Sequence, residues 1–261
     1  MNELRVVDLG IVPYATGLDW QKELHAKRLK DEAPDVLLLL EHPHVYTLGR
    51  RFSREHLLVS DEVLKEKGID VQEADRGGSI TYHGPGQLVA YPIVDLRRPD
   101  RDLPDAIRYL RVLEEAIIRT VRSFGVMATR REGNTGVWVG ENKLAAIGVN
   151  VSRGVSRHGL ALNVSTDLEF FAGMVPCGIS GAGVTSLAGL LGAAPSIDEV
   201  KGVLARNLAK LLYRRVVNGN GEDLGLVSEN LPEVVALNSR KRRAARKTDT
   251  GSPGSALGGK S

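Results

Sequence analysis

The only cysteine of the 261-residue chain, Cys177, lies in a glycine-rich stretch between Pro176 and Gly178. A cysteine that only fills a core usually occupies the apolar face of a helix or strand, so a position in a loop favours a thiol that substrates reach. The alternative is an inert cysteine. A nucleophilic thiolate needs a neighbour that lowers the pKa of the thiol and takes its proton. Chemistry at this sulfur therefore requires a basic side chain beside it.

Lys143 and four histidines are the candidates for that partner. Lys143 begins a run that is otherwise apolar, residues 144–149, so its ammonium either extends to solvent or lies desolvated at the mouth of a pocket. A histidine would instead form a cysteine–histidine pair, and the rings available for it are His42, His44, His83 and His158. His42 and His44 flank a proline, but no third ligand follows at metal-site spacing, so we predict no metal site.

Residues 76–87, Arg-Gly-Gly-Ser-Ile-Thr-Tyr-His-Gly-Pro-Gly-Gln, form a glycine-rich motif between two predicted strands. Glycine permits positive φ and lets a ligand approach bare backbone N–H groups. The motif also carries a charge on Arg76, a hydroxyl on Thr81 and an imidazole on His83. These features predict a loop that binds a ligand, with a simple tight turn as the alternative. Residues 42–50 are a second candidate loop.

The elements that would position these residues follow from hydrophobic periodicity. Strands are predicted at residues 4–12, 36–41, 69–74, 88–96, 126–129, 135–139, 143–149 and 155–164. Helices are predicted at residues 16–33, 60–67, 104–124 and 196–215. Pro92 indicates that its strand lies at an edge or carries a bulge. Because strands cluster between a few long helices, the order favours an α/β (α+β) fold with a mixed, largely antiparallel sheet flanked by helices.

The charge pattern predicts one catalytic domain, residues 1–238, and a basic disordered tail, residues 239–261. The tail holds seven of the 35 basic residues and one of the 32 acidic residues, so the net charge of +3 becomes −3 for residues 1–238. An acidic body argues against nucleic-acid binding. The longest aliphatic run, residues 36–40, is too short to span a membrane, and no signal-peptide pattern is present. We therefore expect a cytoplasmic protein.

Six segments together resemble the lipoate-protein octanoyltransferases of the biotin/lipoate ligase-like superfamily. They are the glycine-rich motif, Tyr-Pro-Ile-Val-Asp-Leu at 91–96, Gly-Val-Trp-Val at 136–139, Lys-Leu-Ala-Ala-Ile-Gly at 143–148, His-Gly-Leu-Ala-Leu-Asn at 158–163 and Pro-Cys-Gly at 176–178. The resemblance runs in this order over residues 36–191, and the superfamily fold is a mixed sheet flanked by helices.

The resemblance implies an enzyme that transfers an octanoyl group from acyl carrier protein to a lysine of a lipoyl domain through a thioester on Cys177, with Lys143 as acid/base partner. It implies an acyl site lined by Arg76, Gly77, Gly78, Ser79, Ile80, Thr81, Tyr82, His83, Ala146, Ile147, Gly148, Gly159, Leu160 and Ala161. The expected acceptors are lipoyl domains of 2-oxoacid dehydrogenase complexes and the glycine cleavage H protein. No ATP, metal or other cofactor is expected, because the acyl group arrives on the phosphopantetheine of acyl carrier protein.

Three alternatives stay open. An ATP-dependent lipoate or biotin ligase would share the fold and an Arg-Gly-rich loop, yet it needs no nucleophilic cysteine. A cysteine hydrolase would pair Cys177 with a histidine and release the acyl group to water. A non-catalytic protein that binds lipoyl domains or RNA would use the basic tail.

Overall fold

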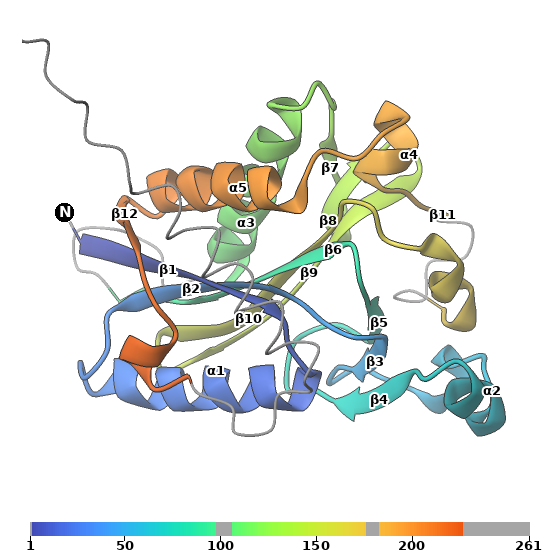
Figure 1. Ribbon diagram of the computed structural model, residues 1–261, viewed down its shortest axis with the longest axis horizontal. Helices are drawn as coiled ribbons and strands as arrows, with labels where there is room; N and C mark the ends of the chain where they lie inside the picture. The colour runs from blue at the N-terminus through green and yellow to red at the C-terminus, as the bar shows by residue number, and fades with distance from the viewer. Residues whose placement is uncertain (1, 98–105, 176–182, 227–261) are drawn as a thin grey trace, which may run out of the picture. The chain divides into compact units, whose positions relative to one another are not determined.

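A long mixed sheet organises the described part of the chain, residues 2–97, 106–175 and 183–226 of this computed structural model (Figure 1). Its strand order is β12-β1-β2-β6-β10-β9-β8-β7, and β11 pairs with β9. The strands are β1 (Asn2–Ile11), β2 (Asp35–Glu41), β6 (Gln87–Ile93), β7 (Thr129–Arg131), β8 (Asn134–Val139), β9 (Asn142–Ser152), β10 (Val155–Asn163), β11 (Gly183–Val184) and β12 (Arg214–Asn218). β1 runs parallel to β2 and β12, whereas the pairs from β2 through β6, β10, β9 and β8 to β7 are antiparallel. The predicted fold class is confirmed.

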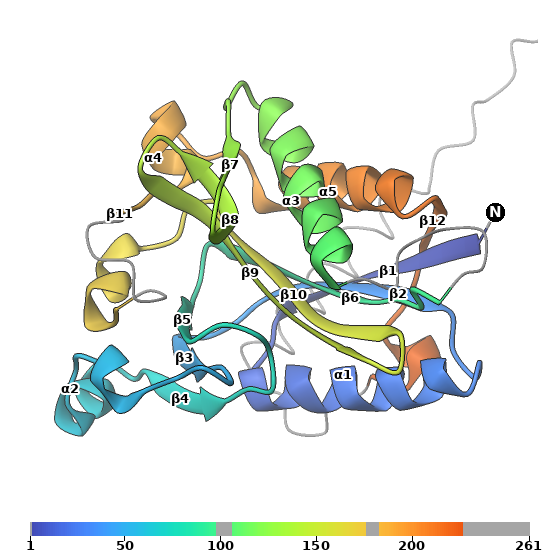
Figure 2. The ribbon, with the colours of Figure 1, turned by 180° about the vertical axis from the view of Figure 1, so that it is seen from behind.

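Helices cover both faces of this sheet, and their placement explains why β2 is apolar along most of its length (Figure 2). α1 (Tyr14–Leu29) covers one face, and α3 (Ala106–Arg122), α4 (Leu187–Leu191) and α5 (Ile197–Leu211) pack on the other. α2 (Asp61–Glu66) packs instead in a separate core, through Leu64. Leu38 packs in one core with Trp20 of α1. The next residue along the strand, Leu39, packs in the other core with Leu113 of α3 and Leu208 of α5. A strand covered on both faces buries successive side chains, so it reads as an unbroken apolar run.

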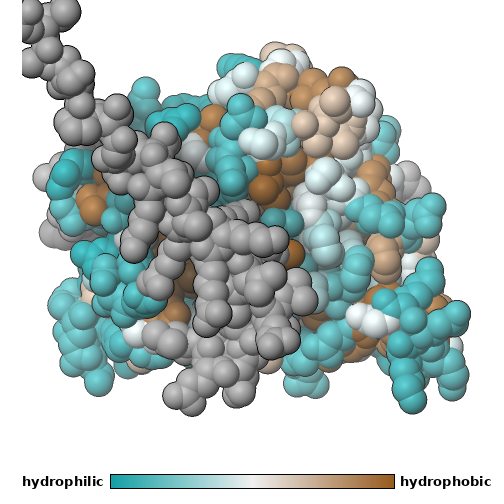
Figure 3. All heavy atoms as spheres, in the orientation of Figure 1, coloured by the Kyte–Doolittle hydropathy of each residue, from teal (hydrophilic) through white to brown (hydrophobic). Residues whose placement is uncertain are grey.

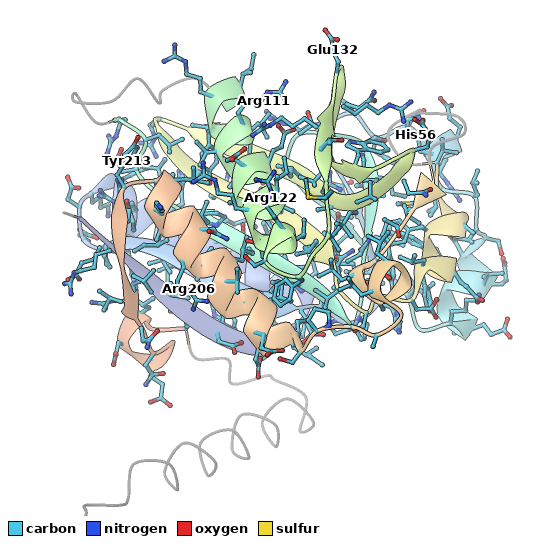
Figure 4. All side chains as sticks on the ribbon, turned by 90° about the horizontal axis from the view of Figure 1, so that it is seen from above. His56, Arg111, Arg122, Glu132, Arg206 and Tyr213 are labelled. Atoms are coloured by element: carbon cyan, nitrogen blue, oxygen red, sulfur yellow. The ribbon has the colours of Figure 1, made fainter. Side chains whose placement is uncertain are left out.

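The outer surfaces of the helices differ in polarity. Seen from above, α3 and α5 lie side by side, and they carry the exposed side chains Arg111, Arg122 and Arg206 (Figure 4). Hydrophilic residues gather over α2, whereas hydrophobic residues gather over α4 (Figure 3). Leu190 and Leu191 of α4 are 37% and 40% exposed.

A three-stranded sheet, in the order β4-β3-β5, carries the glycine-rich motif. Its strands are β3 (Val45–Leu48), β4 (Asp70–Glu73) and β5 (Ile80–His83). The prediction of two continuous loops at residues 42–50 and 76–87 is therefore wrong in part. Ile80 and Tyr82 are 2% and 0% exposed because they pack with Tyr46 in a core of their own. That burial, together with antiparallel pairing between β3 and β5, makes a strand where glycines on both sides indicated a loop.

Pro92 was predicted to mark an edge strand or a bulge, and the edge position is wrong because Pro92 lies inside the large sheet. β6 lies between β2 and β10, but its regular pairing with β10 stops at Ala90 and Leu160. Beyond that point His158 has a φ of 55°, and its N–H donates to Oε1 of Gln21 over 2.7 Å instead of to β6. A proline without an N–H is tolerated in this central strand because β10 leaves the regular register opposite it and rejoins only at Ser156, whose N–H donates to the carbonyl of Val94 over 3.0 Å.

The last predicted helix is too long. The capping box at Ser196 and Glu199 is present, but α5 ends at Leu211, and Tyr213 has a φ of 56°. Arg214 then begins β12, where its Nε donates to Oδ2 of the buried Asp35 over 2.7 Å. Helix spacing alone missed this strand because its partner, β1, lies at the other end of the sequence.

The described residues belong to one unit that spans Met1–Val227. The predicted domain boundary at residue 238 and the basic tail lie outside the described residues. Over residues 2–97, 106–175 and 183–226, none of the helices combines the length and the apolar character needed to cross a membrane.

Candidate active site

A cavity of about 710 Å³ lies where the glycine-rich motif meets β9 and β10. Thirteen of the predicted site residues line it: Arg76, Gly77, Gly78, Ile80, Thr81, His83, Lys143, Ala146, Ile147, Gly148, Gly159, Leu160 and Ala161. They come from three segments of the sequence, residues 76–83, 143–148 and 159–161. The fold thus brings most of the predicted site residues to one cavity.

Small residues face each other across the β9–β10 pair. Ala146 pairs with Ala161, and Gly148 pairs with Gly159. A Cβ on Gly148 would lie 2.9 Å from the carbonyl oxygen of Gly77, whose N–H donates to the carbonyl of Val149 over 2.9 Å. The glycine-rich motif therefore docks directly on β9, and larger side chains would close the space between them.

Arg76 holds the glycine-rich motif in shape. The residue is 7% exposed, and its guanidinium donates to the carbonyl oxygens of Gly77, Ser79 and Thr47 at 2.6 to 3.0 Å. It also donates to Oγ1 of Thr47 at 2.7 Å. A guanidinium that satisfies several buried carbonyls in this way fixes the backbone that surrounds it.

Ser79 and Tyr82 belong to the predicted site but are not among the residues that line the cavity. The hydroxyl of Ser79 lies 2.8 Å from Nδ1 of His56, and the hydroxyl of Tyr82 lies 2.7 Å from Nδ1 of His44. Both side chains are buried. Their contacts connect the wall of the cavity to the segments that carry His56 and His44.

Lys143 is half-buried at the cavity, and its ammonium lies close to an aromatic ring. Its Nζ lies 4.8 Å from the centroid of the Trp138 ring, and Val184 of β11 pairs with it along the strand edge. The predicted nucleophile, Cys177, lies outside the described residues. The cavity is lined by Met174, which precedes Cys177 along the sequence, and by Val184, which follows it.

An aromatic and histidine cluster forms another part of the wall, and it includes Tyr14 and Tyr91, which were not among the predicted site residues. The Tyr14 ring is stacked on the His83 ring with their centroids 6.2 Å apart, and burial raises the pKa of Tyr14 to about 12. Tyr91 also lines the cavity, and its hydroxyl lies 2.8 Å from Nε2 of His42. β6 is buried along its whole length, so no local pattern of this strand distinguishes Tyr91 from its neighbours.

The His158 ring lines the cavity and is bound to a carboxylate. Its Nε2 lies 2.6 Å from Oδ1 of Asp75, which also forms an ion pair with Arg157. The hydrogen bond from His158 is the main cause that lowers the pKa of Asp75. Burial lowers the pKa of His158 although the carboxylate opposes that shift, so the ring is neutral at pH 7 and donates its Nε2–H.

No group of three or more His, Cys, Asp or Glu side chains in the described part of the chain is arranged to hold a metal ion. The histidines near the cavity are engaged with a tyrosine, a glutamine or an aspartate instead.

The family of the chain follows from comparison with known proteins. The family model of the lipoyl protein ligase A/B catalytic domain matches residues 13–209, which include every residue that lines the cavity. The chain belongs to this family. Members similar to it include the octanoyltransferase of Solibacter usitatus, 52% identical over 81% of this chain and 94% of that protein. The octanoyltransferase of Syntrophobacter fumaroxidans is 46% identical over 89% of this chain and 96% of its own length.

Solved structures share the fold of this chain. A crystal structure of lipoate-protein ligase A bound with ATP superposes with a TM-score of 0.71, over 85% of this chain and 92% of that one. The two sequences are 19% identical, so this likeness concerns the fold alone. The resemblance read from the six sequence segments is confirmed by the octanoyltransferases.

Proposed function

We propose that this chain transfers an octanoyl group from acyl carrier protein to a lysine of a lipoyl domain through a thioester on Cys177. The observation that carries the proposal is the cavity, which combines paired small residues with Lys143 at one end of the same strand. The similarity to octanoyltransferases over most of the chain supports the same activity.

The cavity suits a linear acyl chain. Its walls include the apolar residues Ile80, Ile147 and Leu160, and the small pairs on β9 and β10 leave room between them. Burial of each methylene is worth about 0.8 kcal/mol, so a closed apolar site discriminates strongly between an eight-carbon chain and a short one.

The chemistry of the first transfer fits a cysteine beside a lysine. The Cys177 thiolate attacks the donor thioester, a new C–S bond forms, and the phosphopantetheine sulfur leaves with a proton from the Lys143 ammonium. Exchange of one thioester for another keeps the acyl group activated. A nearby ammonium also favours the thiolate over the thiol.

The second transfer runs through the same pair. The amine of the acceptor lysine attacks the Cys177 thioester, a C–N bond forms and the C–S bond breaks. Lys143, now a neutral amine, takes the proton that the attacking nitrogen loses. General-base help of this kind contributes about a hundredfold or more. No ATP or metal takes part in either step of the proposed reaction.

Intact-protein mass spectrometry after mixing with octanoyl-acyl carrier protein, without ATP, tests the proposal. We expect one octanoyl adduct that hydroxylamine removes, and its transfer to a lipoyl domain added later. Cys177→Ser is expected to abolish the adduct, and Lys143→Ala is expected to slow both its formation and its discharge.

Each competing function gives a different result in this assay. Lipoyl-domain product that forms only when ATP and free octanoate are supplied would identify a ligase and reject the transferase. Free octanoate without modified lysine would identify a hydrolase. An unchanged adduct in Cys177→Ser would remove the cysteine from the mechanism.

A further inference from the structure

A chain of hydrogen bonds connects the backbone of Lys143 to the ring of His83. The carbonyl of Lys143 accepts from the N–H of Thr185 over 3.0 Å, and the carbonyl of Thr185 accepts from Nδ2 of Asn163 over 3.0 Å. Oδ1 of Asn163 then accepts from Nε2 of Gln87 over 2.9 Å. Oε1 of Gln87 lies 2.7 Å from Nδ1 of His83.

Main-chain carbonyls determine which group donates and which accepts in each of these hydrogen bonds. A carbonyl only accepts, so the Thr185 oxygen requires the amide nitrogen of Asn163 and leaves Oδ1 of that residue for Gln87. Nε2 of Gln87 donates in addition to the carbonyl of Tyr82 over 3.2 Å. Its Oε1 therefore faces His83 and only accepts, so Nδ1 of His83 carries the hydrogen. A neutral His83 then keeps its lone pair on Nε2.

His83 lies at the cavity with little access to bulk water. It is 6% exposed and lines the cavity, and no described residue forms a hydrogen bond with its Nε2. Burial, with the neighbouring His42 second, lowers the pKa of His83 well below its ordinary value. The titratable or charged groups around the ring are Tyr14, His42, Arg76 and His158. The ring is therefore neutral at pH 7 and presents an acceptor.

We propose that Nε2 of His83 accepts an N–H hydrogen bond from the amine of the acceptor lysine, and that Gln87 and Asn163 are positioning residues for this acceptor. The proposal rests on the proposed function, because the attacking amine is the reacting group that brings an N–H into the cavity. The hydrogen bond would turn the nitrogen lone pair of the amine toward the thioester carbon. No proton has to move onto the ring.

The tautomer is tested directly on the unmodified protein. Long-range ¹H–¹⁵N correlation spectra of the histidines are expected to show the hydrogen of His83 on Nδ1. A hydrogen on Nε2 would overturn the proposal, and this readout does not depend on any enzymatic activity.

Two variants of Gln87 test the role in transfer, with loading of the acyl group and its discharge to a lipoyl domain measured separately. Gln87→Met removes the acceptor for Nδ1–H, so discharge is expected to slow about tenfold while loading is unchanged. Gln87→Glu favours the charged ring, which has no lone pair on Nε2. The acid limb of the discharge rate is therefore expected to move up by about one pH unit.

Gln72→Met is the matched control, because the side-chain amide of Gln72 donates to Asp70 on β4, away from this network. Equal slowing of loading and discharge in Gln87→Met, or a discharge rate equal to that of the control, would contradict the proposal. If the parent protein forms no octanoyl adduct at all, the proposed function fails, whereas the tautomer spectrum still decides the arrangement of His83.

Discussion

The hydroxyl of Tyr91 donates to Nε2 of His42 over 2.8 Å, and the Nδ1–H of the same ring donates to the carbonyl of Val12 over 2.6 Å. Both ring nitrogens are therefore used by the neutral form. His42 is 0% exposed, and burial lowers its pKa to about 4. In an imidazolium both nitrogens carry hydrogen, so Nε2 could no longer accept the hydrogen bond from Tyr91. Burial would also disfavour its charge.

The buried histidines predict a protein that loses stability in mild acid. His42, His83 and His158 all have folded-state pKa values below the ordinary value near 6.5. The unfolded chain then binds more protons than the folded one as the pH falls below about 6.5. The free energy of unfolding is expected to fall with falling pH by up to about 1.4 kcal/mol per pH unit for each histidine. Urea unfolding between pH 7.5 and pH 5 measures this slope.

His42→Gln and Tyr91→Phe separate the titration from the hydrogen bond. His42→Gln removes one titrating group, so the acid slope is expected to become shallower. Tyr91→Phe leaves a buried ring nitrogen without its donor, which is expected to cost about 1–3 kcal/mol at pH 7.5 while the slope persists. An acid slope in His42→Gln equal to that of the parent would show that this histidine does not contribute to it.

The contact between Lys143 and Trp138 predicts an aromatic requirement for acyl loading. A cation over an indole face is stabilised by about 0.5–2 kcal/mol, so Trp138→Leu is expected to slow loading about three- to tenfold, whereas Trp138→Phe keeps a ring and most of the rate. Rapid-quench mass spectrometry of the acyl adduct measures the rate. Arg131 also lies over the Trp138 ring, at 5.2 Å from its centroid, so Arg131→Ala controls for loss of the other cation. Equal rates in the leucine and phenylalanine variants would argue against the contact.

The small-residue pairs predict that chain-length preference resides in β9 and β10. Ala146→Val adds two methyl carbons to the cavity wall beside Ala161, so the octanoyl donor is expected to lose more of its kcat/KM than the hexanoyl donor. Each methylene that no longer fits costs about fourfold in rate. Parallel assays with six-carbon and eight-carbon acyl carrier proteins measure the ratio. A ratio that stays at the parent value would place the acyl chain elsewhere.

Local patterns predicted a ligand-binding loop in the glycine-rich motif, and the family resemblance supplied the rest of the expected site. Small residues occur in the glycine-rich motif, after Lys143 and after His158. They lie where one backbone segment comes close to another, and a short stretch of sequence is enough to recognise them. Thirteen of the residues that the resemblance implied line one cavity.

The sequence by itself therefore determined the class of the fold, the small residues that line the cavity and the family to which the chain belongs. Only the tertiary structure decided that β12 pairs with β1, that Pro92 lies in the middle of the sheet, and that Gln87 orients His83. Each of these depends on partners brought together by packing, at separations that reach more than 200 residues for β12 and β1. A hydrophobic period or a turn motif encodes only neighbours along the chain, so it cannot specify which distant donor meets which acceptor.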